Sequence, residues 1–382
     1  MSVILKAFKS VHEIPSGEVV IRQGPAPLNL PPPAFPGQSL SDLLSGLGTA
    51  SIRRGQQHEW MIPGVELELY TLDNGLFFLD HGLDGTVATE DGYPVHESSA
   101  FRSHPSAGRE AETVIDANPI DLGEVFVGFD GAWRNYFHWM CFGLVKSYLA
   151  QRLLNKAVLI AVPDYRAALE SGPISYNEAT YNQSLLYSGL SERVTHLPRG
   201  VYRARRLHFF WTDPPQPTDI IYLPQFYEPF DHISRHAIPV DPLFRDIYLG
   251  RSKSVASRID SGAAQAVAET VERHRFTTID FEGLDLLQQI SIMAGAERVI
   301  SPHGAGLTNC LFNRTGMCLL ELNKALDGQS SLRPWFFLLS HGRGHRYVML
   351  DTGLQDFSAS HVESALSVLD SFGDSPRRLA LT

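Results

Sequence analysis

The second half of the chain alternates short apolar runs with amphipathic segments, and this alternation restricts the folds that it can adopt. Four of the apolar runs have the length of single strands: 247–249, 276–279, 298–300 and 318–322. The segments 263–274 and 284–294 place apolar residues at the spacing of one helix face. Strands separated by helices of this length need right-handed crossovers and form a parallel sheet. Residues 241–382 are therefore predicted to form an α/β domain, in which 347–350 adds a further strand.

A glycine-rich turn follows the third of these strands. Residues 301–309 have the sequence SPHGAGLTN, and a short helical run leads on to the next strand. Glycines let the backbone approach a ligand closely, and the first amides of a helix have no partners within it. His303 adds a side-chain donor and Asn309 adds an amide. The turn predicts an anion site; the alternative is a tight connection whose glycines serve only steric needs.

Two further loops are predicted to reach the same edge of the sheet, because ligands of parallel sheets bind beyond the carboxyl ends of the strands. Arg251, Lys253 and Arg258 follow the first strand and can clamp a diphosphate, since arginine makes planar, two-pronged contacts with phosphate. Glu321 ends the fourth strand and could accept hydrogen bonds from a ribose diol. The alternatives are a solvated basic loop and a surface or capping carboxylate.

The first 240 residues are predicted to form a separate domain that begins with two small parts. Residues 1–60 are expected to be an irregular arm, because prolines crowd its middle and cannot join regular strand ladders. Residues 61–105 alternate apolar and polar side chains around Asp73-Asn74-Gly75. This pattern predicts a hairpin within a small antiparallel element.

Residues 110–235 return to strands and helices and are predicted to be Rossmann-like. An apolar helix is expected over 136–154, and short strands are expected at 207–211 and 220–223. Seven prolines between 212 and 242 mark the predicted linker to the second domain.

An aromatic segment stands where a strand meets the apolar helix of the first domain. Its sequence from 135 to 139 is NYFHW. His138 could be a general base, because the pKa of histidine lies near neutrality and burial can adjust it. The alternative is a core histidine that is hydrogen-bonded to the backbone.

Three blocks of the sequence resemble those of glycosyltransferase family 61, a group once described as capsular polysaccharide biosynthesis proteins. In family order they are NYFHW at 135–139, IYLGRSK at 247–253 with Arg258-Ile259, and RVISPHGAGLTN at 298–309 continuing to LEL at 320–322. The likeness covers about residues 110–325 and does not extend to residues 1–100. The third block is rather specific, and the three blocks together are more specific than any one of them.

The resemblance implies a GT-B type architecture, in which two Rossmann-like domains face a cleft. It implies a transferase that moves a sugar, with a UDP-sugar expected, from a nucleotide-sugar to a glycan or lipid-linked glycan acceptor, with inversion. The donor site would lie in the second domain and comprise Arg251, Lys253, Arg258, His303, Gly304, Ala305, Gly306, Asn309 and Glu321. The acceptor side would contribute His138 as the base, with Asn135 and Trp139 beside it. Since the sequence has no evident paired-carboxylate metal motif in the expected place, no metal or other cofactor is expected.

Two departures from the family pattern leave other functions open. Relatives tend to carry Asn-Glu where this chain has Asp260-Ser261, and an acidic residue soon after the His-Trp pair, where this chain has Cys141, Phe142 and Gly143. The expected carboxylate could instead be Asp116, Glu124 or Asp130. One alternative function is a catalytically silent module that binds nucleotide-sugar or glycan in a polysaccharide-assembly system. A phosphate-ester hydrolase is the other, although the chain lacks a GxSxG elbow and a P-loop.

Composition limits the partners and the compartment. A net charge of −10 argues against a nucleic-acid-binding protein, which needs a basic face. The three cysteines lie in apolar surroundings and have no metal-ligand spacing, so buried thiols in a reducing, cytoplasmic setting are predicted. No signal peptide or membrane span is expected from the sequence. Peripheral association with a membrane stays open, because glycan acceptors are often lipid-linked.

Overall fold

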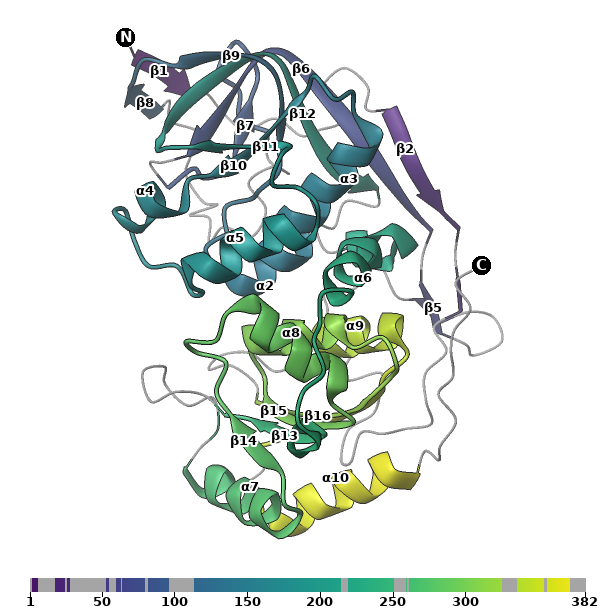
Figure 1. Ribbon diagram of the computed structural model, residues 1–382. Helices are drawn as coiled ribbons and strands as arrows, with labels where there is room; N and C mark the ends of the chain where they lie inside the picture. The colour runs from purple at the N-terminus through teal and green to yellow at the C-terminus, as the bar shows by residue number, and fades with distance from the viewer. Residues whose placement is uncertain are drawn as a thin grey trace. The chain divides into compact units, whose positions relative to one another are not determined.

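The computed structural model divides the chain into two compact units (Figure 1). The first unit comprises Met1–Gly24 and Gly64–Pro229, and the second comprises Pro25–Pro63 and Phe230–Thr382. The structure describes residues 2–5, 18–24, 26–27, 53–54, 60–62, 64–79, 82–95, 113–213, 219–250, 259, 261–324, 335–353 and 356–371.

A mixed sheet forms the body of the first unit. Its strands are β2 (Glu18–Gln23), β6 (Val65–Leu79), β7 (Val87–Ala88), β9 (Ile120–Val127), β10 (Leu159–Pro163), β11 (Val194–Leu197) and β12 (Gly200–Asp213). Among the described residues the order is β11-β10-β9-β12-β6-β2, with β7 paired to β6. The strands from β11 to β12 run parallel, whereas β6 is antiparallel to β12. Separately, β1 (Ser2–Leu5) pairs antiparallel with β8 (Thr113–Asp116).

Helices connect the parallel strands of the first unit. The segment between β9 and β10 is continuously helical through α2 (Tyr136–His138), the π-helix η3 (Trp139–Leu144) and α3 (Val145–Leu153). After β10, α4 (Tyr165–Leu169) and α5 (Glu178–Tyr187) lead to β11. The predicted helix over 136–154 is confirmed. Because the chain continues from β9 to β10 on one side while β12 lies on the other, the carboxyl end of β9 is a point where ligands of parallel sheets bind.

The predicted hairpin at Asp73-Asn74-Gly75 is wrong, because β6 runs through these residues as one strand against β12. Asn74 takes a left-handed conformation with φ 49°, which asparagine tolerates, and so the chain does not reverse. A Cβ on Gly75 would lie 2.9 Å from Leu207 Cβ, which explains the glycine by close packing. Val65–Leu79 is therefore part of the main sheet of its unit.

Two other expectations for the first 240 residues need correction. The arm 1–60 is not irregular throughout, since β1 and β2 lie in it together with β3 (Ala26–Pro27) and β4 (Arg53–Arg54). The last two strands pair with β5 (Trp60–Ile62) in a small sheet of the second unit. The strand expected at 220–223 is instead the 3-10 helix η4 (Asp219–Tyr222).

Prolines start short helices in the proline-rich stretch before the second sheet. Pro224 begins the 3-10 helix η5 (Pro224–Tyr227), and Pro242 begins η6 (Pro242–Phe244). The fixed φ of proline suits the first helical position, where the missing N–H is not needed. Between them lies α6 (Glu228–Ser234).

The second unit contains a parallel sheet with helices on both faces. Its strands are β13 (Asp246–Leu249), β14 (Thr277–Ile279), β15 (Arg298–Pro302), β16 (Cys318–Asn323) and β17 (Arg346–Asp351). Their order among the described residues is β14-β13-β15-β16-β17, and every pair is parallel, as the sequence predicted. This is the 2-1-3-4-5 order of doubly wound sheets, whose ligands bind between the first and third strands. Here the two strands are β13 and β15.

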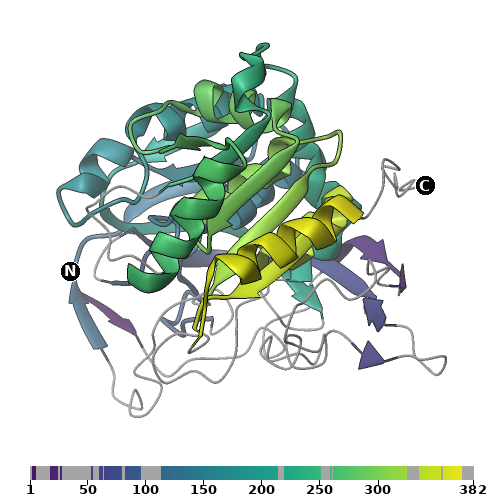
Figure 2. The same ribbon diagram turned by 90° about the horizontal axis from the view of Figure 1, so that it is seen from below.

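Five helices of the described chain accompany this sheet. They are α7 (Ser261–Arg273), α8 (Leu286–Gly295), the 3-10 helix η7 (Ala305–Phe312), α9 (Trp335–Arg343) and α10 (Ala359–Ser371). Figure 2 shows α7 and α10 together on one face of the sheet. Val267 and Leu366 from these helices pack with Ile300, Leu320 and Val348 in one buried cluster. No helix among the described residues is both long and apolar enough to cross a membrane.

The three cysteines are buried and form no disulfide, as predicted from their surroundings. Burial raises the pKa of the Cys310 thiol to about 12. Nearby His345 is neutral, since its Nδ1 accepts from the Met317 N–H at 3.3 Å and its Nε2 donates to the Cys310 carbonyl at 2.9 Å. Burial lowers the pKa of His345 to about 4.

The His345 pKa predicts how the stability of the protein depends on pH. In the unfolded chain this histidine titrates at about 6.5. The contribution of neutral His345 to the free energy of unfolding should therefore be complete above pH 6.5. It should fall by roughly 3 kcal/mol as pH drops toward 4, because the unfolded state binds a proton at a higher pH than the folded state does. Urea unfolding of the wild type and His345→Gln across this range measures the difference. Identical pH slopes for the two proteins would contradict this assignment.

A pair of glycines tests how tightly the first unit packs near the end of β9. Gly85 and Gly82 both have positive φ, 73° and 66°. A Cβ on Gly85 would lie 2.6 Å from Asp130 Cα, whereas one on Gly82 would meet nothing within 4 Å. Gly82→Ala should cost about 1–2 kcal/mol of unfolding free energy, from backbone strain alone. Gly85→Ala should cost roughly 1–3 kcal/mol more, from overpacking. Equal losses of unfolding free energy in the two variants would show that the backbone at Asp130 shifts at little cost to make room for the added Cβ.

Candidate active site

The loop from Gly128 to Asn135, between β9 and α2, is held tightly against the helix that follows it. A Cβ on Gly128 would lie 2.1 Å from Ser147 Oγ, and that hydroxyl donates to the Gly128 carbonyl at 3.3 Å. On the π-helix, a Cβ on Gly143 would lie 3.3 Å from the same carbonyl. Glycines at these positions let the helix and the end of β9 approach closely.

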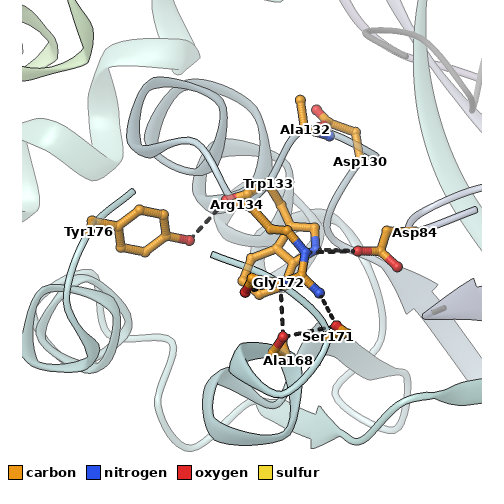
Figure 3. A network of polar contacts seen from close by, with 9 residues as sticks. All are labelled: Asp84, Asp130, Ala132, Trp133, Arg134, Ala168, Ser171, Gly172 and Tyr176. Atoms are coloured by element: carbon orange, nitrogen blue, oxygen red, sulfur yellow. Dashed lines mark hydrogen bonds and ion pairs between the residues drawn. The ribbon is translucent and has the colours of Figure 1, made fainter. Parts of the chain in front are cut away.

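Arg134 anchors the second half of this loop (Figure 3). Its guanidinium donates from Nη1 to the carbonyls of Ala168 and Gly172 at 2.9 and 3.1 Å, and from Nη2 to Ser171 Oγ at 2.7 Å. Its Nε faces Asp84 Oδ2 at 3.4 Å. Arg134 thus holds together three segments around the start of the helix.

Trp133, the neighbour of Arg134, completes this network. Its indole N–H donates to Asp84 Oδ2 at 3.1 Å, and its carbonyl accepts from Tyr176 OH at 2.9 Å (Figure 3). The arginine also lies over the indole ring, 5.2 Å from the ring centroid. Since the donors of Arg134 are used within the protein, this arginine positions the loop.

Two residues expected at the cleft make contacts within the first unit. Asn135 caps α2, and its Oδ1 accepts from the Phe137 N–H at 3.0 Å. Trp139 is fully buried; its indole N–H donates to Ser184 Oγ at 2.9 Å, and its ring lies 4.6 Å from that of Tyr181. The indole of Trp139 therefore has no surface to offer an acceptor, whereas Asn135 is exposed and only its Oδ1 is used by the cap.

His138 lies at the last position of α2 and is partly buried. Its ring contacts those of Phe137 and Phe142, at centroid distances of 5.4 and 5.6 Å. Burial lowers the pKa of His138 below its ordinary value; the Asp130 carboxylate opposes this shift, and the Lys146 ammonium adds to it. The imidazole is therefore neutral at pH 7, which is the form that accepts a proton.

The three alternative carboxylates differ in their surroundings. Glu124 accepts from His208 Nε2 at 2.9 Å and pairs with Arg206 at 3.0 Å on the sheet; the His208 hydrogen bond is the main reason why its pKa is lowered. The backbone of Asp116 ends β8, and its side chain lies outside the description. Asp130 is the carboxylate whose negative charge favours a higher pKa of His138.

A second cluster lies at the carboxyl ends of β15 and β16. The His303 Nδ1 hydrogen-bonds Glu321 Oε1, to which Asn323 Nδ2 also donates at 3.0 Å. Tyr347 OH donates to Glu321 Oε2. Glu321 is fully buried and His303 is 6% exposed, with its ring edge-on to Phe336 at 5.2 Å.

This arrangement changes the role expected for Glu321. Both of its oxygens have protein partners and it has no exposed surface, so it cannot accept hydrogen bonds from a ribose. It holds the imidazole of His303 instead. Because Nδ1 faces the carboxylate, Nε2 is the ring nitrogen that a ligand can meet.

The glycine turn joins His303 to η7. The backbone at Gly304 is extended, Ala305 opens the 3-10 helix, and the Leu307 N–H donates to the Gly304 carbonyl at 2.9 Å. A Cβ on Gly306 would meet nothing within 4 Å. Asn309 does not face a ligand, because it is fully buried and its amide donates to Gln289 Oε1 at 2.9 Å.

Arg251, Lys253 and Arg258 lie outside the described residues. The chain reaches their loop from Gly250, at the carboxyl end of β13, whose N–H donates to the Ile279 carbonyl at 2.8 Å. Within the described chain, no group of three or more His, Cys, Asp or Glu side chains is arranged to hold a metal ion.

The sequence interpretation missed Lys146, Tyr347 and Asn323. Asn323 follows Glu321 at the two-residue spacing of one strand face, which was a usable signal. The contact with Tyr347 depends on β17 lying beside β16, a sheet order that no local pattern specifies. Lys146 is separated from His138 by the π-helix, so ordinary helical spacing does not place the two residues on one face.

Comparison with known proteins gives one family. The family model described as Glycosyltransferase 61 matches residues 136–320, which is 185 of the 382 residues. The match begins at α2 and ends inside β16, so it includes His138 and His303. The search of curated proteins gave no match to this sequence.

The hydroxyl of Tyr347 provides a test of the buried cluster. Tyr347→Phe leaves Glu321 Oε2 buried without its donor, which should lower the free energy of unfolding by about 1–3 kcal/mol. Tyr248→Phe is the matched control, since no described residue hydrogen-bonds that hydroxyl. Denaturant unfolding of both variants gives the comparison. Equal, small losses would mean that the Tyr347 hydroxyl contributes nothing to holding Glu321.

Proposed function

Since this chain is a glycosyltransferase of family 61, we propose that it moves a sugar from a nucleotide-sugar to a glycan or lipid-linked glycan acceptor. The observation that carries this proposal is the buried His303–Glu321 pair at the carboxyl edge of a 2-1-3-4-5 parallel sheet. Such an edge is where doubly wound sheets bind nucleotides. A UDP-sugar is the donor to test first.

The donor is proposed to bind the second unit. Its diphosphate would meet His303 Nε2 and the basic residues Arg251, Lys253 and Arg258, beside Gly304 and Gly306. When the sugar leaves, negative charge grows on this diphosphate, and preorganised donors stabilise it most at that moment. Four nitrogen-bearing side chains of this kind would let the transfer proceed without a metal ion.

The acceptor is proposed to bind the first unit, where His138 would take the proton of the attacking hydroxyl. A base facing the acceptor is what an inverting transfer requires, because the hydroxyl attacks opposite the leaving group. In this proposal the two units act as the two domains of a GT-B enzyme.

A catalytically silent module is the second candidate. It is favoured by the buried, uncharged residues Cys141, Phe142 and Gly143, which stand where relatives carry an acidic side chain. Release of nucleoside diphosphate in the presence of an acceptor would exclude it.

Nucleotide binding tests the donor site. A ligand at 100 times its Kd stabilises the folded protein by about 2.7 kcal/mol, so UDP should raise the Tm clearly in a panel of nucleoside diphosphates. His303→Ala and Arg251→Ala should each weaken UDP binding about tenfold or more, because a hydrogen bond to a charged group contributes about 1.5–3 kcal/mol. The same substitutions should weaken the binding of uridine, which has no phosphate, much less.

Two controls accompany this panel. Arg273→Ala removes a surface arginine paired with Glu363 in the same unit and should leave UDP affinity unchanged. Binding should also persist with EDTA present. Equal losses for UDP and uridine would assign His303 and Arg251 to folding, and loss of binding in EDTA would overturn the metal-free proposal.

Turnover tests the base. His138→Gln should reduce kcat by roughly 10²-fold or more, the lower end of what a general base contributes, with UDP affinity near wild type. Because burial lowers the pKa of His138, activity of the wild type should fall only as pH drops below about 6.5. A variant with normal turnover and lowered Tm would make His138 a packing residue.

A further inference from the structure

A buried carboxylate lies at the carboxyl edge of the second unit's sheet without a lysine or arginine bound to it. Glu321 is fully buried, and its hydrogen bonds come from the side chains of His303, Asn323 and Tyr347. No lysine or arginine of the described chain hydrogen-bonds it. Removing a charge from water is costly unless an opposite charge accompanies it. Within this cluster, the imidazole of His303 is the group that can become a cation.

The other two partners hold Glu321 as a hydrogen-bond acceptor. The hydroxyl of Tyr347 donates to Oε2, and burial, together with the Glu321 charge, raises the pKa of Tyr347 so that this hydroxyl keeps its proton. The amide nitrogen of Asn323 donates to Oε1 at 3.0 Å and lies farther from His303 Nδ1, at 3.4 Å. Both side chains therefore keep the carboxylate in place beside the imidazole.

The contact between His303 and Glu321 decides how many protons the pair needs in order to bind a phosphate oxygen. Because Nδ1 hydrogen-bonds Oε1, one proton lies between these two atoms. A bare Nδ1 would instead set its lone pair against those of the carboxylate. With that single proton Nε2 is bare, and a bare ring nitrogen cannot donate to a phosphate oxygen. Donation from Nε2 requires a second proton on the pair.

We propose that binding of the nucleotide-sugar at this edge takes up one proton from solvent, which His303 Nε2 carries and donates in a hydrogen bond to the diphosphate. The proposal rests on the diphosphate site of the proposed function. Glu321 supplies the counter-charge, and Tyr347 and Asn323 are positioning residues that act through it.

The same proton serves the transfer step. When the bond from the sugar carbon to the diphosphate breaks, its electron pair stays on the diphosphate oxygen. The hydrogen bond from Nε2 is then strongest, because donors that are already in place stabilise charge as it develops. The proton returns to solvent when the nucleoside diphosphate leaves.

The groups around the pair leave it as the place where the proton count can change. Two other titratable groups of the described chain interact with Glu321, namely Tyr347 on β17 and Cys310 on η7. Burial raises the pKa of both, that of Cys310 to about 12, so both keep their protons near neutral pH. From α9, the uncharged ring of Phe336 lies edge-on to His303 at 5.2 Å.

Calorimetry of UDP binding at pH 8, in buffers of different ionisation enthalpy, counts the protons. The last phosphate pKa of UDP is about 6, so the nucleotide has lost that proton and any uptake belongs to the protein. The wild type should take up roughly half to one proton per UDP. Because binding takes up a proton, UDP affinity should weaken by about three- to tenfold as pH rises from 8 to 9.

Two substitutions assign the proton, and a third is the matched control. His303→Gln keeps an uncharged donor and should bind UDP about tenfold more weakly, with no proton uptake. Tyr347→Phe removes a donor from Glu321, which makes the pair bind its proton more readily, so the loss of UDP affinity should move to higher pH. His274→Gln removes another His–Glu pair of this unit, with Glu363 at 2.5 Å, and should change neither result.

The outcomes separate this proposal from the proposed function. UDP binding without proton uptake, or uptake that persists in His303→Gln, would overturn the proposal and leave the diphosphate site in place. Absence of UDP binding would overturn the diphosphate site and this proposal with it. Uptake through His303 without sugar transfer would support the proposal and favour the silent module. The wild-type proton count needs no variant, so it decides even where a variant fails to fold.

Discussion

Both units depend on one property of parallel strands, which is that their carboxyl ends meet at a common edge. In the second unit this edge brings the ends of β15 and β16 together, and His303 and Glu321 meet there although 18 residues separate them. In the first unit the end of β9 carries the loop with Asp130 and begins the helix with His138. The candidate site residues of the two units lie at two such edges, each built by crossover connections.

Polar residues near these edges act mainly through other residues. Glu321 orients His303, Arg134 fixes the loop before α2, and Asn309 joins η7 to α8 through Gln289. Each is buried or largely satisfied by protein partners, so each holds its neighbours in place within its own unit. A buried polar side chain that makes such contacts stabilises one arrangement of its neighbours and makes the alternatives costly.

Local patterns predicted the parallel sheet of the second unit and the apolar helix of the first, because strand and helix periodicity are encoded within each segment. The hairpin at Asn74 could not be excluded in this way, since the same left-handed asparagine fits a turn or an irregularity inside a long strand. The sequence also placed His303 and Glu321 at the carboxyl edge of the second unit's sheet, where the structure has them. His303 and Glu321 were identified, but their hydrogen bond, and the Tyr347 donor, depend on side-chain geometry and on which strands are neighbours.

The π-helix holds about one residue more than an α-helix with the same number of turns. Deleting a single residue between Trp139 and Leu144 would restore ordinary α-helical hydrogen bonding, and the side chains beyond it would keep nearly the same direction, because seven α-helical steps rotate the chain by about 700°, roughly 20° short of two full turns. Insertions and deletions are usually tolerated in loops and harmful in helices because they disturb packing. Here a one-residue gap in an alignment would mark a relative with an ordinary α-helix in place of the π-helix and the same helix faces on both sides of it.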